Sequence, residues 1–371
     1  MNQTAKDQLD RLLGFLASDP GNAALLSDAI EAALAVPALD TAQGLVVQLG
    51  ELRPGSFEAG YFAATLAMIN KDFARAAELL GPLVGAGAPP NARFNLAWSK
   101  AMIGAKGEAI ELLDPETTDQ IASAAMLRTQ LVHEAGDFDS AMQFGKAALE
   151  RFPDDAGLNA SMATLALDLE DVELARACAA RGGDHPEALA ATGVLEMQDG
   201  SSAQARATFD RSLAIREHNP RAWVGRGLTR LVEHDPAAAA LDIDRGAQQF
   251  GDHIGSWIAA GWAHYLAGDL DAAVQRFERA LAIDPNFAES HGSLAVIDAA
   301  RGEGDSARRR MNTALRLDRQ CFSAVLAKVM LDAGSAEAAQ TLIEQAFSTP
   351  LGGSGMTVSS YMAGLMRPTL H

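Results

Sequence analysis

Residues 261–277, GWAHYLAGDLDAAVQRF, bring together side-chain types that catalysis and metal binding use. Trp262, His264 and Tyr265 stand within four positions, and two aspartates follow at 269 and 271. A histidine near carboxylates can act as a general base or bind a metal ion. Aromatic side chains at this spacing can equally form a binding surface or the inside of a fold. The choice depends on what repeats elsewhere in the chain.

Other residues with chemical potential form no known catalytic pattern. Five of the eight histidines lie between His218 and His291, without an HxxxH pair or Cys/His ligand spacing. The sequence has no phosphate-binding loop, dinucleotide fingerprint or serine nucleophile elbow. Cys178 and Cys321 lack CxxC spacing, which favours free thiols in a reducing compartment. We therefore expect no catalytic residue, no cofactor and no metal, and interpret the chain as a non-enzyme.

The net charge and the hydropathy of the sequence argue against several classes of binding partner. The formal net charge of −18 repels phosphate backbones and anionic lipid, so we expect neither nucleic-acid nor membrane binding. The N-terminus carries three aspartates and is not a secretory signal, and no stretch reaches the ~20 apolar residues of a membrane span. These features predict a cytoplasmic protein.

The tryptophans reveal a period. Trp223–Gly227 recurs 34 residues later as Trp257–Gly261, and a fixed period of this length is typical of a helical solenoid. Within one period, residues 254–267 place Trp257, Gly261 and His264 on one helical face. Gly268–Asp269 then supplies a turn and a helix cap, and Asp284–Pro285 ends a second helix.

The segment WIAAGWAHYLAGDLDAAVQRFERALAIDP resembles a tetratricopeptide repeat. It matches the family's W…G…GD…A…F…A…P pattern at Trp257, Gly261, Gly268, Asp269, Ala273, Phe277, Ala280 and Pro285. It departs from the pattern at His264, where the family usually has tyrosine. The resemblance implies an all-α fold: an α-solenoid of about ten stacked helix–turn–helix units in a right-handed superhelix with a concave inner surface, and no fused catalytic domain.

The period divides the chain. Unit starts fall near 23, 57, 90, 122, 156, 186, 220, 254, 288 and 322. We expect an N-terminal capping helix within 1–22 (at 4–17), a repeat array in two halves, 23–185 and 186–351, and a linker and C-terminal helix or tail over 352–371. Residues 81–91 predict a long loop, and residues 181–186 a hinge between the halves. The helix over 356–371 caps the array, plugs the groove or binds a partner.

The position of a residue within the repeat predicts whether its side chain lies in the core or on the concave surface. His264 and His291 are expected in the core, whereas His218, His234 and His253 lie near turns and are expected to be exposed. In the family, the first helix of each unit lines the concave surface. The side chains expected there, rich in aromatic residues and methionine, are the candidate partner-binding residues: Tyr61, Phe94, Trp98, Met126, Gln130, Arg221, Trp262 and Tyr265. The alternative is that a tight superhelix buries these side chains against adjacent units.

These features favour a protein–protein interaction adaptor that binds a peptide or helix of another protein in its groove. A dedicated chaperone or assembly factor for a secreted or multi-subunit client is the second hypothesis. Self-association of the solenoid into a homo-oligomer is the third. The sequence names no partner.

Overall fold

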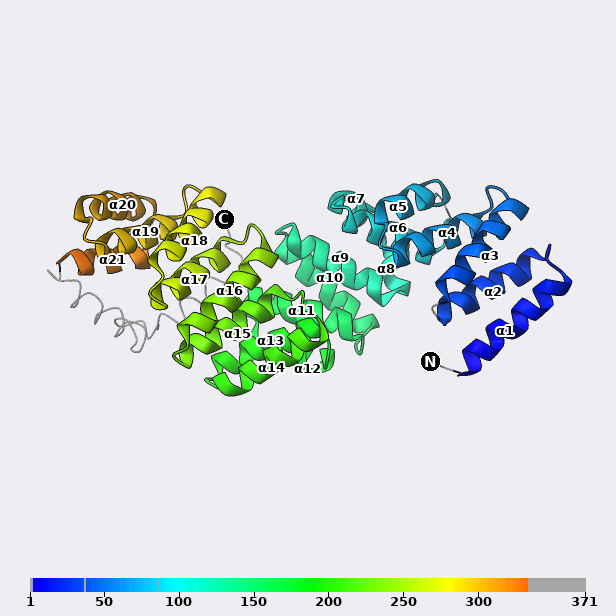
Figure 1. Cartoon of the computed structure of the whole chain (residues 1–371), viewed down its shortest axis with the longest axis horizontal. Helices are drawn as coiled ribbons and strands as arrows, with labels where there is room; N and C mark the ends of the chain where they lie inside the picture. The colour runs from blue at the N-terminus through cyan, green and yellow to red at the C-terminus, as the bar shows by residue number, and fades with distance from the viewer. Residues whose placement is uncertain (1–2, 37, 86, 333–371) are drawn as a thin grey trace. The chain divides into compact units, whose positions relative to one another are not determined.

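The computed structural model describes residues 3–36, 38–85 and 87–332, in which the regular elements are helices joined by short turns and no strand occurs (Figure 1). Close contacts divide the chain into two compact units, residues 1–158 (unit 1) and 159–371 (unit 2), with the boundary inside α11. The elements are α1 (Gln3–Ser18), α2 (Ala23–Ala35), α3 (Leu39–Leu52), α4 (Phe57–Ile69), α5 (Phe73–Leu80), the 3-10 helix η1 (Gly81–Leu83), α6 (Pro90–Met102), α7 (Lys106–Leu112), α8 (Pro115–Gln120), α9 (Ala122–Glu134), α10 (Phe138–Arg151), α11 (Ala156–Asp168), α12 (Val172–Gly182), α13 (Pro186–Gln198), α14 (Ser202–Ile215), α15 (Pro220–Val232), α16 (Pro236–Phe250), α17 (Ile254–Leu266), α18 (Leu270–Ile283), α19 (Ala288–Ala300), α20 (Gly304–Leu317) and α21 (Phe322–Asp332).

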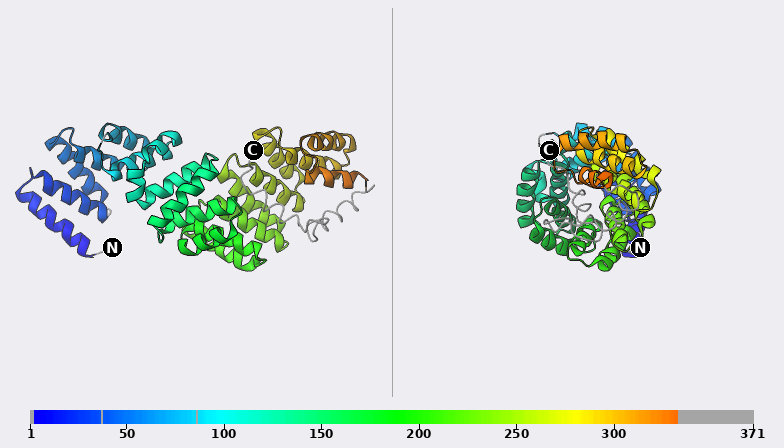
Figure 2. Two further views of the ribbon diagram at one scale, coloured as in Figure 1. Left: turned by 180° about the vertical axis from the view of Figure 1, so that it is seen from behind. Right: turned by 90° about the vertical axis from the view of Figure 1, so that its left-hand side faces the viewer.

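The first helix of each repeat begins where the 34-residue period predicts. All ten unit starts expected from the sequence coincide with the first residue of a helix, from α2 at 23 to α21 at 322. Each first helix except α11 and α21 is followed within the described residues by a second helix whose packing against it is established, and the same alternation is visible from behind in each unit (Figure 2). The short helix α8, between α7 and α9, was not expected.

The turns that precede α10 and α18 share the same chemistry. Gly136 and Gly268 adopt φ of 82° and 81° there, a left-handed conformation that glycine reaches without steric cost. The next residue is an aspartate whose carboxylate accepts a hydrogen bond from the backbone N–H three residues on, as Asp269 does from Ala272 at 2.9 Å. This cap satisfies a donor that would otherwise lack a partner at the start of the second helix.

Small residues allow the paired helices of unit 2 to approach closely. A Cβ added to Gly261 of α17 would lie 2.3 Å from a ring carbon of Phe277 in α18. Gly193 and Gly225 stand in the same relation to the buried ring of Phe209. The aromatic ring of a second helix therefore fills the space that the missing glycine side chains leave.

Buried ion pairs join successive helices of unit 2. Arg226 of α15 makes two hydrogen bonds, of 2.7 and 2.8 Å, to Asp242 of α16, and a third of 2.7 Å to Asp210 of α14. One repeat later, Asp244 of α16 accepts two 2.7 Å bonds from Arg276 of α18. Buried charges are tolerated only when they are paired in this way.

At the start of α15 and of α17, a tryptophan side chain hydrogen-bonds to the loop that precedes the helix. The Trp223 indole donates to the Glu217 carbonyl at 2.8 Å, and the Trp257 indole donates to the Gly251 carbonyl at 2.6 Å. Arg245 lies over the Trp223 ring, 4.3 Å from its centroid, and also pairs with the Glu217 carboxylate. The period that aligns the two tryptophans therefore also aligns their hydrogen bonds with the preceding loop.

The remaining expectations divide into three groups. The helix expected at 4–17 is α1, and the loop expected over 81–91 contains η1 and ends where α6 begins at Pro90. The division into halves at residue 185, the hinge and the handedness of the superhelix stay predictions. The linker and the helix expected over 356–371, together with residues 333–351 of the last repeat, lie outside the described residues.

Candidate partner-binding surface

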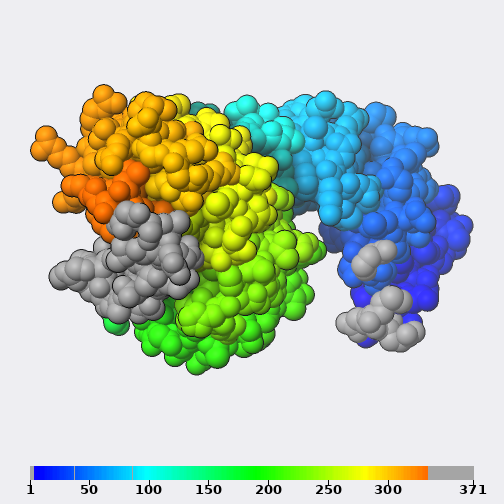
Figure 3. Space-filling view, turned by 60° about the vertical axis from the view of Figure 1, so that its left-hand side comes forward, coloured from blue at the N-terminus to red at the C-terminus, as the bar shows by residue number. Residues whose placement is uncertain are grey.

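Three first helices of unit 1 carry an uncharged surface rich in aromatic residues. Phe94 and Trp98 lie one turn apart on α6 with ring centroids 6.1 Å apart, and both are half-buried against the cluster that contains Leu127. We define the unit 1 face as the eight side chains Tyr61, Thr65 and Met68 of α4, Phe94, Trp98 and Met102 of α6, and Met126 and Gln130 of α9. Figure 3 shows the first helices of unit 1, coloured dark blue to cyan, in contact with their neighbours in chain order.

Tyr61 connects α4 to α6. Its hydroxyl oxygen accepts hydrogen bonds from the side-chain amides of Asn95 at 3.1 Å and Asn91 at 3.2 Å, and its ring stacks on Phe57 with centroids 5.7 Å apart. Burial raises the pKa of the Tyr61 phenol, the two amides lower it, and the Glu31 carboxylate raises it further; the net pKa lies above its ordinary value. The phenol is therefore neutral at physiological pH, and the first helices of consecutive repeats are held in register.

Apolar side chains remain exposed beside this face. At the carboxyl ends of α4 and α6, Ile69 is 43 % exposed and Met102 is 52 % exposed, and the adjoining Ile103 is also exposed. The helices α4 and α6 contact each other directly. Neighbouring apolar side chains that remain in water are typical of interaction sites, because a bound partner covers them.

Met126 and Gln130 are half-buried on α9, at the other end of the face. The Met126 sulfur fills the space above Gly157, where an added Cβ would lie 2.7 Å away. Methionine adjusts its shape easily, so Met126 can serve both as packing and as contact surface. The structure therefore brings five predicted residues, Tyr61, Phe94, Trp98, Met126 and Gln130, onto consecutive first helices, and their role in binding stays a prediction.

Trp262 and Tyr265 lie elsewhere, in the core of unit 2. Only 1 % of Trp262 and 6 % of Tyr265 is exposed. The Trp262 ring packs edge to face on Tyr265 and on Phe277, with centroids 5.5 and 5.7 Å apart. Burial raises the pKa of Tyr265 to about 12. For these two residues the alternative left open by the sequence holds, namely burial against adjacent units.

Arg221 is held by a carboxylate two repeats away. Its guanidinium donates to both oxygens of Asp168, at 3.0 and 3.2 Å, and the Asp168 side chain is only 4 % exposed. This pair links α11 to α15, the first helices of two repeats that are separated by the repeat beginning at α13. Arg221 is thus engaged within the fold, and no sequence signal in a 34-residue period points to a partner 53 residues upstream.

The histidines of the opening segment and its neighbours are structural. His264 is largely buried and forms a 2.9 Å hydrogen bond to Asp244, as expected for a core residue. The expectation of a core position for His291 was wrong, because its ring is only half-buried and donates at 2.9 Å to the Pro285 carbonyl. His218 and His234 are exposed as expected. The expectation of an exposed His253 was wrong, because its ring is half-buried and accepts a hydrogen bond from the Ser256 N–H at the start of α17.

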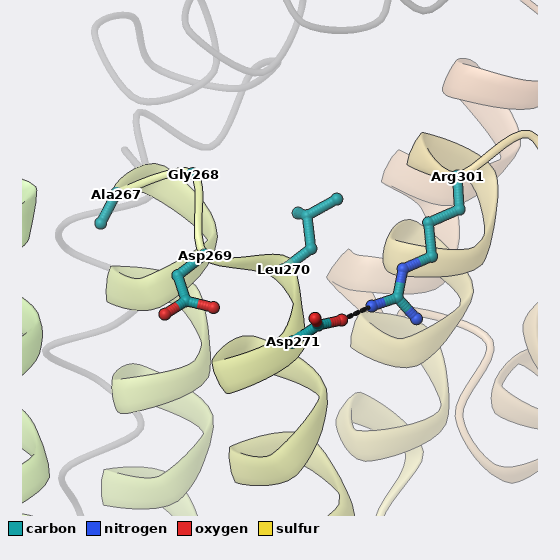
Figure 4. Close-up of a pocket in the computed structure, with 6 residues that line it drawn as sticks. All are labelled: Ala267, Gly268, Asp269, Leu270, Asp271 and Arg301. Carbon is teal, nitrogen blue, oxygen red and sulfur yellow. Dashed lines mark hydrogen bonds and ion pairs between the residues drawn. The ribbon is translucent and has the colours of Figure 1, made fainter.

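A depression beside the second half of that segment also has a structural explanation. It is lined by Ala267, Gly268, Asp269, Leu270, Asp271 and Arg301 (Figure 4). Asp269 caps α18, and Asp271 pairs with Arg301 of the next repeat. Both carboxylates are therefore occupied within the fold.

The rest of the described chain offers little for chemistry. Among residues 3–332, apart from 37 and 86, no group of three histidine, cysteine or acidic side chains is arranged to hold a metal ion. Burial raises the thiol pKa of both Cys178 and Cys321, which makes them poor nucleophiles. None of the helices in the described ranges is both long and apolar enough to cross a membrane.

Comparison with known proteins agrees with the repeat pattern. Family models of the tetratricopeptide repeat match residues 161–220 and 264–327. A curated relative, a heat shock protein sti1 homolog of Schizosaccharomyces pombe, is 26 % identical over 162 residues, which are 44 % of this chain and 27 % of that protein. This chain therefore matches about a quarter of the relative's length.

Similar solved structures include a tetratricopeptide repeat protein from Parabacteroides merdae, with TM-score 0.42 and 15 % identity over 68 % of this chain and 98 % of that one. Another is a chain of the APC/C hetero-tetramer Cut9–Hcn1, with TM-score 0.39 and 15 % identity over 86 % of both chains. The two family matches cover α12–α14 and α18–α20, helices that the 34-residue period also predicts. The chain carries tetratricopeptide repeats over residues 161–220 and 264–327.

Proposed function

We propose that this protein is an interaction scaffold that binds a segment of another protein on the unit 1 face. The observation that carries the proposal is the contrast between the two units. In unit 1 the aromatic first-helix side chains are half-buried and adjoin the exposed Ile69 and Met102, whereas in unit 2 the corresponding Trp262 and Tyr265 are buried. Aromatic side chains that are partly desolvated and rigidly placed are the usual anchors of protein interfaces.

The test compares capture of partner proteins from native lysate by the wild-type full chain and three variants of it. The variant Phe94→Ala/Trp98→Ala removes the two α6 anchors, and we expect it to lose the proteins that the wild type captures. A second variant, Ile69→Glu/Met102→Glu, places charge on exposed side chains that contribute little to the core, so it should lose the same proteins and still fold. The matched control is Ile215→Ala/Leu241→Ala, which trims exposed apolar side chains of unit 2.

Circular dichroism shows whether each variant retains its helices. Capture that both unit 1 variants keep at the wild-type level would overturn the proposal. A chaperone role predicts in addition that a captured client becomes soluble only on co-expression with this chain. Self-association predicts a concentration-dependent mass in light scattering that Ile69→Glu/Met102→Glu abolishes.

A further inference from the structure

A groove with an acidic wall extends the unit 1 face toward the N-terminus. It lies between α1 and α2 and is lined by Ala5, Gln8, Leu12, Asp28, Glu31, Ala32 and Ala35. Its apolar lining consists mainly of small alanine side chains, so it has room for a narrow, unbranched side chain. Glu31 belongs both to this groove and to the surroundings of Tyr61, whose phenol pKa its charge raises.

The carboxylates of this groove have no counter-ion. Asp28 and Glu31 lie three residues apart on α2 and therefore on the same side of the helix. Both are exposed, and neither forms an ion pair with any residue in the described part of the chain. Residues 1–158 hold 11 Lys and Arg against 21 Asp and Glu, a net charge of −10. The repulsion within this region is relieved when a cation binds.

The spacing of the first helices sets the spacing of the ligand. Packed helices lie about 8–10 Å apart, and the hydrogen bond from Asn95 to Tyr61 shows that α4 and α6 are such neighbours. An extended chain advances about 3.3 Å per residue, so it crosses one first helix about every three residues. An extended ligand would cross the α1–α2 groove first, Tyr61 about three residues later, and Phe94 and Trp98 after about three more.

From this arrangement we infer that the partner segment is extended and carries a lysine or arginine followed at about three-residue intervals by two apolar side chains. The basic side chain lies in the α1–α2 groove, with its methylenes on the alanines and its charge beside Asp28 and Glu31. The two apolar side chains contact Tyr61 and the Phe94–Trp98 pair. This inference rests on the proposed function, because it specifies the ligand of the same face.

The experiment is selection from a random twelve-residue peptide library displayed on phage, against the full-length protein. We expect enriched peptides to share one basic position and two apolar positions about three and six residues from it. Selection against Asp28→Lys/Glu31→Lys should replace the basic position with an acidic one and keep the apolar pair. Selection against Phe94→Ala/Trp98→Ala should enrich none of these peptides.

A synthetic copy of the most enriched peptide then gives the energetics. Replacing its basic residue with glutamine should weaken binding to the wild type about two- to fivefold, as for an exposed ion pair. The same replacement should have no effect on binding to Asp28→Asn/Glu31→Gln. The control Asp10→Asn/Glu51→Gln removes equal charge from exposed positions of unit 1 outside the groove, and there the replacement should cost as much as in the wild type.

The outcomes separate the inference from the proposed function. Enriched peptides that depend on Phe94 and Trp98 but lack a basic position would overturn the inference and leave the proposed function standing. The absence of any peptide that depends on these two side chains would overturn both.

Discussion

Replacing Gly261 by alanine tests whether the close approach of α17 and α18 stabilises unit 2. The new Cβ would lie 2.3 Å from one ring carbon of Phe277 and 2.5 Å from another. Ordinary contact begins near 3.4 Å, so the ring must retreat by about 1 Å. It has little room to do so, because it is fully buried and packs on Trp262.

Two effects of opposite sign decide the result. Alanine favours the helix over glycine by up to about 1 kcal/mol, whereas overpacking a filled core costs about 1–3 kcal/mol. We expect overpacking to win, so that the free energy of unfolding falls by about 1–2 kcal/mol. The control Gly304→Ala, at the start of α20, meets only Leu331 at 3.8 Å and should change stability by less than about 0.5 kcal/mol.

The assay is urea unfolding followed by tryptophan fluorescence, which mainly reports unit 2 because three of the four tryptophans lie there. Phe277→Leu should lower stability alone, but in combination with Gly261→Ala the two losses should add to less than their sum, since the smaller side chain makes room for the methyl group. If Gly261→Ala proves as stable as the wild type, or if the two losses simply add, the close-packing argument is refuted.

Three further predictions concern the buried polar groups of unit 2 and the thiols. Burial raises the pKa of Asp244, but the hydrogen bonds from Arg276 and His264 outweigh this effect, so the folded-state pKa lies below its ordinary value. The stabilisation from the ionised carboxylate is therefore complete above the unfolded pKa of about 3.9 and is lost as the pH falls through the lower folded pKa. Acid titrations of stability should show a steeper fall below about pH 4 for the wild type than for Asp244→Asn. Asp242→Ala leaves Arg226, whose side chain is 15 % exposed, without its main partner and should cost about 3–5 kcal/mol in urea unfolding, whereas Asp252→Ala breaks a solvent-exposed pair with Arg279 and should cost less than about 1 kcal/mol. Cys178 and Cys321 are buried thiols with raised pKa values, so a thiol reagent should modify both slowly in the native protein and rapidly in urea; fast labelling of either in the native state would contradict the packing described.

The fold was predictable because its signals are local. Gly268, Asp269 and Pro285 mark turns and helix ends within one repeat, and Gly136, Asp137 and Pro153 do the same in another. The short helix α8 also had a local signal, since Asp114 caps it and Pro115 occupies its first position, but the 34-residue phase has no place for it.

The site was predictable only in part, because exposure depends on neighbouring repeats. Phase alone assigns Trp98 and Trp262 to the same surface, yet the first is half-buried and the second is enclosed by helices of its own and adjoining repeats. Arg221 is engaged by Asp168, two repeats upstream, which no single period reveals. Such contacts follow from how neighbouring repeats pack on one another, which the sequence pattern does not state.

The ion pairs of unit 2 also bear on how the array could gain or lose a repeat. Asp210 and Asp244 occupy the same phase, 34 residues apart, so excision of residues 220–253 would bring Asp210 to the position from which Asp244 contacts Arg276 and His264. The excised block also takes Arg226 and Asp242 together, so neither charge stays behind alone. Deletion of this one repeat therefore keeps these two sets of core ion pairs intact, but it also removes Arg221 and so breaks the pair with the buried Asp168.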